Sequence, residues 1–478
     1  MNKIINWIEK YKFLIIILCL TALARIPSLF EPYWYGDEAI YLTIGQAIKS
    51  GIPLYYGIHD NKPPFIYVIT ALAEGNQFWF KFIALWWVLA TIIVFYKFSQ
   101  KVFDRQKWVI LASGLFALLI CWPKLEGNIA NAELFFLLPT ISAMYILWVK
   151  PTFKAILVAG VCLGLGSLFK MPAILEAGIW PLVWFFGKDN KWFLKSLILV
   201  VGILIPIGFS AGYFGIAGSL KEYLTAAWAQ NLPYLSSWKV AGEEKGLFSL
   251  TGRLTATAIW IIVILILSKK QEARFRIMGL WAIIGLFATL LSGRPYPHYM
   301  LQSAGVLAVS GVLVFAGKKR ERGLGIIVMT AFLAAAVLFK FYDYQVVGYY
   351  NNFGEWLLGR KSQQRYFEWF NSQVNNNYLI AENIYTDSKP GDRIFVWGDE
   401  PVLYALSKRL PVGKYTVKYH IKDFKAEKET LNILKQETPK YIVSFGKEEE
   451  LPGLDELLEN NYRVQNQIGE AVIYRVLF

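Results

Sequence analysis

The first long apolar run of the chain ends in the stretch ARIPSLFEPYWYGDEAIY, residues 24–41. It places two adjacent acids, Asp37 and Glu38, among aromatic and aliphatic side chains. Carboxylates are costly at the edge of a lipid bilayer, so acids in such a position are candidates for a functional site. The stretch therefore predicts a membrane protein with an ionisable site at the membrane edge.

The composition supports a membrane location. Only 18% of the 478 residues are charged and 55% are hydrophobic, whereas a soluble protein is nearer a quarter charged. The length alone would allow about three soluble domains. The long apolar runs instead indicate a protein that crosses the membrane several times. The net charge of +14 comes largely from Lys and Arg in short loops between apolar runs, a pattern of membrane orientation and not of nucleic-acid binding. The three cysteines show no metal-site or disulfide spacing.

Eleven apolar segments are expected to span the membrane as helices. They run over residues 12–29, 78–98, 108–121, 132–149, 155–169, 172–186, 194–214, 254–267, 277–291, 299–316 and 324–342. Basic residues cluster in alternate loops and at the N-terminus, which predicts a cytoplasmic N-terminus and a C-terminal region on the outer side. The basic start and the Ala22–Ala24 stretch also fit a cleavable signal peptide, whose removal would leave the orientation of the later helices unchanged.

Outside these segments, two parts of the chain have their own character. In the outer loop over residues 30–77, Ile40, Ile44, Ala47 and Ile48 share one helical face, which predicts a helix on the membrane surface. The segment KPPFIYVITALA that follows is too short to span and is also placed at the interface. A second large outer loop covers residues 215–253.

After residue 342 the chain becomes polar and rich in asparagine. We expect a helix over 362–388, strands over 393–398 and 440–445, a helix over 423–436 and a last strand over 471–477. The chain thus divides into a membrane region, residues 1–342, and a small α/β domain on the outer face, residues 343–478. The α/β domain contains no glycine-rich phosphate fingerprint.

Ionisable residues near spanning segments gather on one side of the predicted topology. They are Asp37, Glu38, His59, Asp60, Lys62, Lys124, Glu126, Glu133, Lys170, Glu176, Arg294 and His298. Random scatter would place about half of them on each side. This one-sided distribution predicts a polar site that faces outward.

Several of these residues also have purely structural interpretations. Asp37 could cap a helix that begins at Glu38, and Glu133 could favour the start of its own helix. Lys62 and Lys170 could extend their ammonium groups to lipid headgroups, and His298 could be an ordinary hydrogen-bonded polar group. Arg294 fits such a reading less well, because its loop lies on the side that otherwise lacks basic clusters.

Taken together, the residues predict one kind of chemistry. A carboxylate can accept the proton of an attacking hydroxyl, and cations can bind a phosphate and stabilise it as a leaving group. The candidate catalytic carboxylates are Asp37, Glu38 and Glu133, and the candidate phosphate-binding residues are Lys62, Lys170, Arg294, His298 and Tyr299. A phosphate attached to a lipid tail would lie at this depth, which indicates group transfer from a lipid phosphate to a hydroxyl.

The same residues carry a family resemblance over nearly the whole chain. Residues 24–69, with the acidic pair and the "KPP" segment, resemble the first outer loop of the GT-C glycosyltransferases. The similarity is to the branch of protein O-mannosyltransferases and lipid A aminoarabinose transferases. Later matches are NAELFFLLPTISAMYILW, GLGSLFKMPAIL, GRPYPHYML and GDRIFVWGDEPVLYALSKRLPVGKY.

The resemblance implies the GT-C fold, a polyprenyl-monophosphate sugar donor and an inverting transfer to a hydroxyl outside the cytoplasm. Asp37 matches the catalytic base, Glu38 is its neighbour, and Lys62 matches the lysine beside the prolines. Glu133 matches a second acid that many relatives carry as Asp in a "TD" context, whereas the context here is "NAE". The resemblance also implies that Lys170, Arg294 and His298 meet the donor phosphate, with Tyr299 beside them.

The resemblance leaves several features of the reaction open. The acceptor can be a glycan, a lipid or a protein, and the sugar is not named. No organic cofactor is implied, and the acidic pair leaves a divalent metal open. The C-terminal domain is short and α/β, unlike the β-rich module of many eukaryotic protein mannosyltransferases. The expected location is an inner or plasma membrane, crossed many times.

A transporter or flippase of lipid-linked sugars is the main alternative. Transporters often contain inverted repeats and place ionisable residues near the bilayer midplane. The hydropathy shows no internal repeat, and the charges lie at one face. A sensor is a further alternative, but the sequence shows no cytoplasmic output domain. The residues therefore favour a transferase.

Overall fold

The computed structural model describes residues 2–149, 152–234, 246–268, 273–341, 344–445 and 451–477. The chain forms two compact units. The helical unit contains Met1–Ile26, Ala84–Gly218 and Trp228–Val346, and the mixed unit contains Pro27–Ile83, Ser219–Ala227 and Val347–Phe478. The first outer loop and the C-terminal segment thus belong to the same unit, although more than 260 residues separate them in the sequence.

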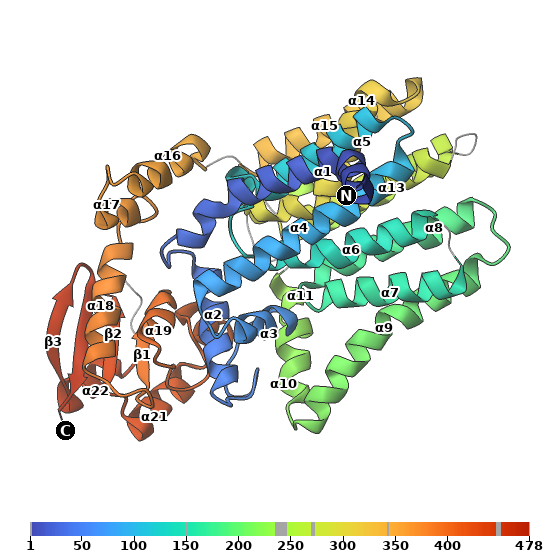
Figure 1. The fold of residues 1–478 in the computed structure, drawn as a ribbon. Helices are drawn as coiled ribbons and strands as arrows, with labels where there is room; N and C mark the ends of the chain where they lie inside the picture. The colour runs from blue at the N-terminus through green and yellow to red at the C-terminus, as the bar shows by residue number, and fades with distance from the viewer. Residues whose placement is uncertain are drawn as a thin grey trace. The chain divides into compact units, whose positions relative to one another are not determined.

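The helical unit is built from long apolar helices (Figure 1). Its main helices are α1 (Asn2–Arg25), α4 (Gln77–Val102), α5 (Gln106–Cys121), α6 (Ala132–Val149), α7 (Phe153–Ser167), α8 (Ile179–Phe186), α9 (Trp192–Ile216), α12 (Leu250–Leu267), α13 (Ala273–Thr289), α14 (Ala304–Ala316) and α15 (Lys319–Leu338). The first residues of α4, up to Ile83, belong to the mixed unit. Short elements in this unit are η2 (Pro123–Leu125), η3 (Met171–Gly178), α11 (Asn231–Tyr234), η5 (Gly246–Phe248) and η7 (Pro297–Ser303). The short helix η1 (Ile26–Phe30) belongs to the mixed unit from Pro27 onward.

Each of the eleven predicted spans is largely helical in the described residues, and residue 342, at the end of the last span, lies outside them. Within the described residues, seven helices are long and apolar enough to cross a bilayer. The segments at Gln106–Cys121, Phe153–Ser167 and Met171–Phe186 are apolar but shorter, and α13 has 17 residues and carries Arg274 and Arg276. The prediction of a multi-pass helical membrane protein is therefore confirmed.

Small residues allow two of these helices to approach closely. Helix α7 packs along α9, where Gly160 of α7 and Gly202 of α9 face each other. A Cβ atom at Gly160 would lie 2.4 Å from the Leu199 carbonyl oxygen. Tight helix packing through small residues replaces the hydrophobic driving force that lipid does not supply.

The mixed unit combines short helices with one sheet. Its helices are α2 (Gly36–Lys49), α3 (Phe65–Leu72), α10 (Leu220–Leu224), α16 (Val346–Leu357), α17 (Gln363–Glu368), α18 (Val374–Thr386), α19 (Val402–Ser407), α20 (Lys418–Asp423), α21 (Glu427–Glu437) and α22 (Leu454–Asn461). A π-helical turn, η4 (Thr225–Ala229), follows α10. The strands are β1 (Ile394–Trp397), β2 (Tyr441–Phe445), β3 (Tyr462–Ile468) and β4 (Ala471–Val476), in the order β1-β2-β4-β3.

Strands β1 and β2 are buried on both faces of the sheet. Strands β1 and β2 are parallel, with Ile394 opposite Tyr441, and the other pairings are antiparallel. Phe395 packs with residues of α21 and α22, whereas Val396 packs with residues of α18 and α19. Two-sided burial explains why the first two strands are continuous apolar runs. The predicted α/β fold of the C-terminal segment is confirmed, with a sheet of four strands.

Helix α2 carries the acidic pair, and its surroundings differ from the prediction. The sequence pattern predicts a helix with one apolar face and one exposed face, but residues 38–45 are buried on all sides. Helices α3 and α19 cover it. A Cβ at Gly45 would lie 2.6 Å from the Thr70 carbonyl carbon, and Gln46 Nε2 donates to the Ala405 carbonyl oxygen at 3.0 Å.

Two further differences lie in the C-terminal segment. The helix predicted over 362–388 is two helices, α17 and α18, because the Asn371 side chain accepts a hydrogen bond from the Gln373 backbone at 2.8 Å and competes with the helix between them. Strand β3 was not predicted. Five of its seven residues are exposed, so it lacks the apolar pattern that identifies the other three strands.

Candidate functional site

The predicted site residues form two clusters, each within one unit. Asp37, Glu38 and Lys62 lie in the mixed unit. The helical unit contains Glu133, Lys170, Arg294, His298 and Tyr299.

Asp37 lies in the first turn of α2. The N-cap of this helix is Tyr35, so the predicted capping alternative for Asp37 is wrong. Its Oδ2 atom accepts a hydrogen bond from the Tyr41 hydroxyl at 3.2 Å and lies 3.3 Å from Lys62 Nζ. The Lys62 ammonium also lies 4.9 Å from the centre of the Tyr41 ring. The Asp37 side chain remains 33% exposed, so the carboxylate is oriented and still accessible.

Glu38 points into a different environment. Its side chain is 2% exposed, and its Oε2 atom lies 3.1 Å from Lys81 Nζ. Lys81 is fully buried and also lies 2.7 Å from Glu31 Oε2. The Tyr349 hydroxyl of α16 donates to Glu31 Oε1 at 2.6 Å. Side chains of successive residues in a helix point about 100° apart. Asp37 therefore reaches the partly exposed Lys62, whereas Glu38 reaches the buried ion network around Lys81.

The cluster in the helical unit joins residues from three distant segments. Glu133, in the first turn of α6, forms an ion pair with Lys170, which follows α7. His298 Nε2 of η7 lies 3.8 Å from Glu133 Oε1, and its Nδ1 contacts the Glu126 carboxylate. Lys170 Nζ lies 4.3 Å from the centre of the Tyr299 ring. Four of the predicted site residues are therefore brought together.

Arg294 lies on the loop that leads to His298, and its backbone N–H donates to Ser292 Oγ at 3.3 Å. The structure adds Arg253, which the sequence interpretation missed. Arg253 is buried at the start of α12, and its Nη2 donates to the Leu291 carbonyl at 3.3 Å. Gly293 adopts φ +69°, and a Cβ there would lie 2.9 Å from Arg253 Nη1. The only sequence signal is an arginine in the first turn of a spanning helix.

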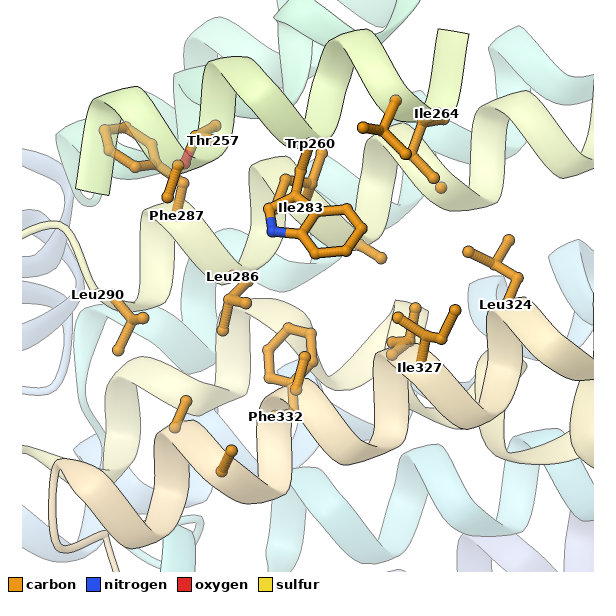
Figure 2. A pocket seen from close by; sticks show the side chains of 18 of the residues that line it. Thr257, Trp260, Ile264, Ile283, Leu286, Phe287, Leu290, Leu324, Ile327 and Phe332 are labelled. Carbon is orange, nitrogen blue, oxygen red and sulfur yellow. The ribbon is translucent and has the colours of Figure 1, made fainter. Parts of the chain in front are cut away.

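An apolar cavity of about 710 Å³ lies between α12, α13 and α15. Figure 2 shows Trp260, Ile264, Leu286 and Phe332 among the side chains around it. Arg253 lines the cavity near the C-terminal end of α13, and Arg320 lines it near the other end of the same helix. The cavity thus has an apolar interior with a buried guanidinium at one end.

Neither cluster resembles a metal site. In the part of the chain that the structure describes, no group of three or more His, Cys, Asp or Glu side chains could hold a metal ion. The carboxylates Asp37 and Glu133 instead pair with Lys62 and Lys170. We therefore derive no chemical step through a metal.

The burial of His420 predicts a pH-dependent contribution to the stability of the protein. Burial lowers the pKa of His420 below its usual value of 6.5. The groups that face it are Asp60, Lys62, Asp423, Asp37 and the His59 ring. Because the folded-state pKa is lower than the unfolded-state pKa, the unfolded chain binds more protons in this range. The contribution of His420 to the free energy of unfolding is therefore fully present above about pH 6.5 and is lost as the pH falls below that value.

We therefore expect the melting temperature of the wild type to fall more than that of His420→Gln between pH 7.5 and pH 5. The measurement is thermal unfolding in detergent over this range. Subtracting the melting temperature of His420→Gln from that of the wild type at each pH cancels the contribution of the other titrating groups. Parallel curves would contradict a buried neutral imidazole at this position.

The structure was then compared with known proteins. It superimposes on ArnT from Cupriavidus metallidurans bound to undecaprenyl phosphate with a TM-score of 0.61 and 14% identity, over 97% of this chain and 98% of that chain. ArnT is a lipid A aminoarabinose transferase with the GT-C fold. This chain has the GT-C fold. The apo form of ArnT matches with a TM-score of 0.60 and 13% identity, over 98% of each chain.

The fold expected from the first-loop resemblance is thus confirmed. No protein-family model matches the chain, and no curated protein matches it in sequence. At this level of identity the GT-C likeness establishes architecture, and the chemistry must be argued from the residues.

Proposed function

We propose that this protein transfers a sugar from a polyprenyl monophosphate to a hydroxyl acceptor with inversion at the anomeric carbon. The observation that carries the proposal is Asp37, a partly exposed carboxylate held by Tyr41 and Lys62 in a chain with the GT-C fold. The transfer is assigned to the outer side of the membrane, with the N-terminus in the cytoplasm.

Asp37 acts as the general base in this mechanism. It accepts the proton of the acceptor hydroxyl as the oxygen forms a bond to the anomeric carbon. The bond between that carbon and the phosphate oxygen breaks, and its electron pair leaves with the polyprenyl phosphate. Because attack and departure occur on opposite faces of the sugar, the single displacement inverts the anomeric centre, as in inverting glycosidases.

The Lys62 contact suits this role. An ammonium 3.3 Å from Asp37 Oδ2 stabilises the ionised carboxylate that a base requires. The Tyr41 hydroxyl binds the same oxygen atom and so limits rotation of the carboxylate. Glu38 is already committed to Lys81 in a buried network, so we assign it a structural role beside the base.

The cations of the helical unit are proposed to bind the donor phosphate. Lys170 and His298 adjoin Glu133, which orients them, and Tyr299 stacks under the Lys170 ammonium. Arg294 follows Gly293 in the sequence, and the buried Arg253 lies against Gly293. The apolar cavity beyond Arg253 is suited to part of an isoprenoid chain. The ArnT structure with undecaprenyl phosphate supports this class of donor.

Substitutions of these cations should weaken donor binding. A hydrogen bond to a charged group contributes about 1.5–3 kcal/mol, so we expect Lys170→Ala and Arg294→Ala each to raise the Kd for undecaprenyl phosphate roughly 10- to 100-fold. The measurement is a binding titration followed by the shift of the melting temperature in detergent. Lys195→Ala, which removes a cation paired with Asp189 elsewhere in the helical unit, is the control. Unchanged affinity in both test variants would rule out the phosphate assignment.

A further inference from the structure

Lys62 is bound on two sides by carboxylates. Its Nζ lies 3.3 Å from Asp37 Oδ2 and 3.9 Å from Asp60 Oδ2. The Asp37 side chain is partly exposed, whereas the Asp60 side chain is 1% exposed. A lysine side chain has four rotatable bonds and a compact ammonium that does not define its own direction. The buried carboxylate of Asp60 therefore helps to determine where the Lys62 ammonium lies.

Asp60 is itself fixed by its neighbours. The Tyr67 hydroxyl of α3 donates to its Oδ2 at 2.6 Å, and the Asn61 backbone N–H contacts its Oδ1 at 2.8 Å. Nε2 of His420 lies 3.5 Å from the same Oδ1. His420 belongs to α20 in the C-terminal segment, so one wall of the Asp60 site is supplied from far along the chain.

The His420 ring is an unusual buried group. It is fully buried, and neither ring nitrogen has a hydrogen-bond partner among the described residues. A buried polar group without a partner costs about 1–3 kcal/mol, and such exceptions call for a specific explanation. The carboxylate 3.5 Å from Nε2 is an acceptor that a small adjustment brings within hydrogen-bond distance.

The backbone keeps His420 close to Asp60. The His59 N–H donates to the Lys414 carbonyl at 2.7 Å, and His59 and Tyr415 form a β-bridge. The His59 ring packs edge-to-face against His420, with ring centres 5.2 Å apart, and against Phe424 at 4.8 Å. The segment that carries Asp60 is thus attached to the C-terminal segment by both backbone and side chains.

We propose that Asp60 and His420 are positioning residues that hold the Lys62 ammonium beside Asp37, so that the C-terminal segment contributes to sugar transfer without touching the substrate. The inference rests on the proposed function. When Asp37 takes up the acceptor proton it loses its charge, and the attraction between Asp37 and Lys62 weakens. Asp60 keeps its charge and retains the ammonium in place, and the His420 ring prevents the Asp60 carboxylate from turning away.

Three substitutions test this positioning role. We expect Asp60→Asn and His420→Leu each to lower kcat about 10- to 100-fold, because misplacement by about 1 Å costs that much. The donor KM should change less than twofold, since neither residue touches the donor. His420→Gln keeps an N–H that can donate to Asp60 and should retain at least half of the wild-type kcat.

A matched control separates positioning from general destabilisation. Tyr404 is buried in the same unit, and its hydroxyl accepts a hydrogen bond from the Val396 backbone. Tyr404→Phe should lower the melting temperature and leave kcat unchanged. If His420→Leu does not fold, the near-isosteric Asp60→Asn decides the question. Wild-type kcat in Asp60→Asn, or equal loss in His420→Gln and His420→Leu, would overturn the inference.

Asp37→Asn, assayed beside these variants, separates the two levels of the proposal. If Asp37→Asn is inactive while Asp60→Asn and His420→Leu turn over normally, the positioning inference fails and the proposed function stands. If Asp37→Asn itself turns over normally, the proposed function fails.

Discussion

Replacing Asp37 with asparagine should reduce sugar transfer about 10²- to 10⁴-fold, which is the usual loss when a general base is removed. The amide has the same shape as the carboxylate and cannot accept the acceptor proton. Because the side chain is 33% exposed and its ion pair with Lys62 is partly exposed, the fold should tolerate the change. The initial rate of donor consumption and the melting temperature are measured on the same sample.

The control for this prediction is Asp189→Asn, which alters an acid in the segment between α8 and α9 that pairs with Lys195. It should leave turnover unchanged. Near-normal turnover in Asp37→Asn would mean that Asp37 is not the base, and that its role is to stabilise the N-terminus of α2 through the helix dipole.

Replacing Lys81 with methionine should destabilise the mixed unit by about 3–5 kcal/mol, because removing one partner leaves a buried charge uncompensated. Lys81 is fully buried and is the cation between Glu31 and Glu38. The free energy of unfolding is measured by denaturant titration in detergent micelles. Restoring the charge balance with Glu31→Gln and Glu38→Gln in the same chain should recover part of the loss.

Lys49→Met is the matched control for Lys81→Met. Lys49 pairs with Glu74, but both side chains are more than half exposed, and exposed pairs contribute little to stability. If Lys81→Met and Lys49→Met have the same free energy of unfolding, the buried ion network of Lys81 does not stabilise the fold around Glu31 and Glu38.

Much of the fold could be predicted because it follows from local patterns. Apolar runs locate the eleven main helices that the structure describes in the helical unit, and uninterrupted apolar segments locate β1 and β2. Strand β3 could not be predicted, since it is largely exposed and pairs only with β4. The burial of α2 depends on α19, which lies more than 350 residues later, and no local periodicity contains that information.

In the candidate site, too, the residues could be selected from the sequence, whereas some of their contacts could not. Residue type and predicted depth selected Glu133, Lys170, His298 and Tyr299, and the structure places them in one cluster. The partners of the acidic pair could not be predicted. Lys81 stands within an apolar helix, and its pairing with Glu31 and Glu38 is visible only in three dimensions.

His420 illustrates the limit most directly. Its surroundings in the sequence are polar and give no sign of a buried position. It becomes significant only because the backbone pairing of His59 with the C-terminal segment brings it to Asp60. The sequence interpretation included Asp60 among the suspicious charges without a role, and the contact with Lys62 supplies one.

The central claim is that this chain breaks the bond between a sugar and a polyprenyl phosphate. The most direct measurement places the purified protein in lipid nanodiscs with polyprenyl monophosphates of mannose, glucose, galactose, arabinose or aminoarabinose and a mixture of hydroxyl acceptors that includes lipid extract. The release of free polyprenyl monophosphate is then quantified. We predict release from one donor of the panel, abolished by Asp37→Asn. Donors that all remain intact and do not raise the melting temperature of the protein would contradict the account and favour a transporter.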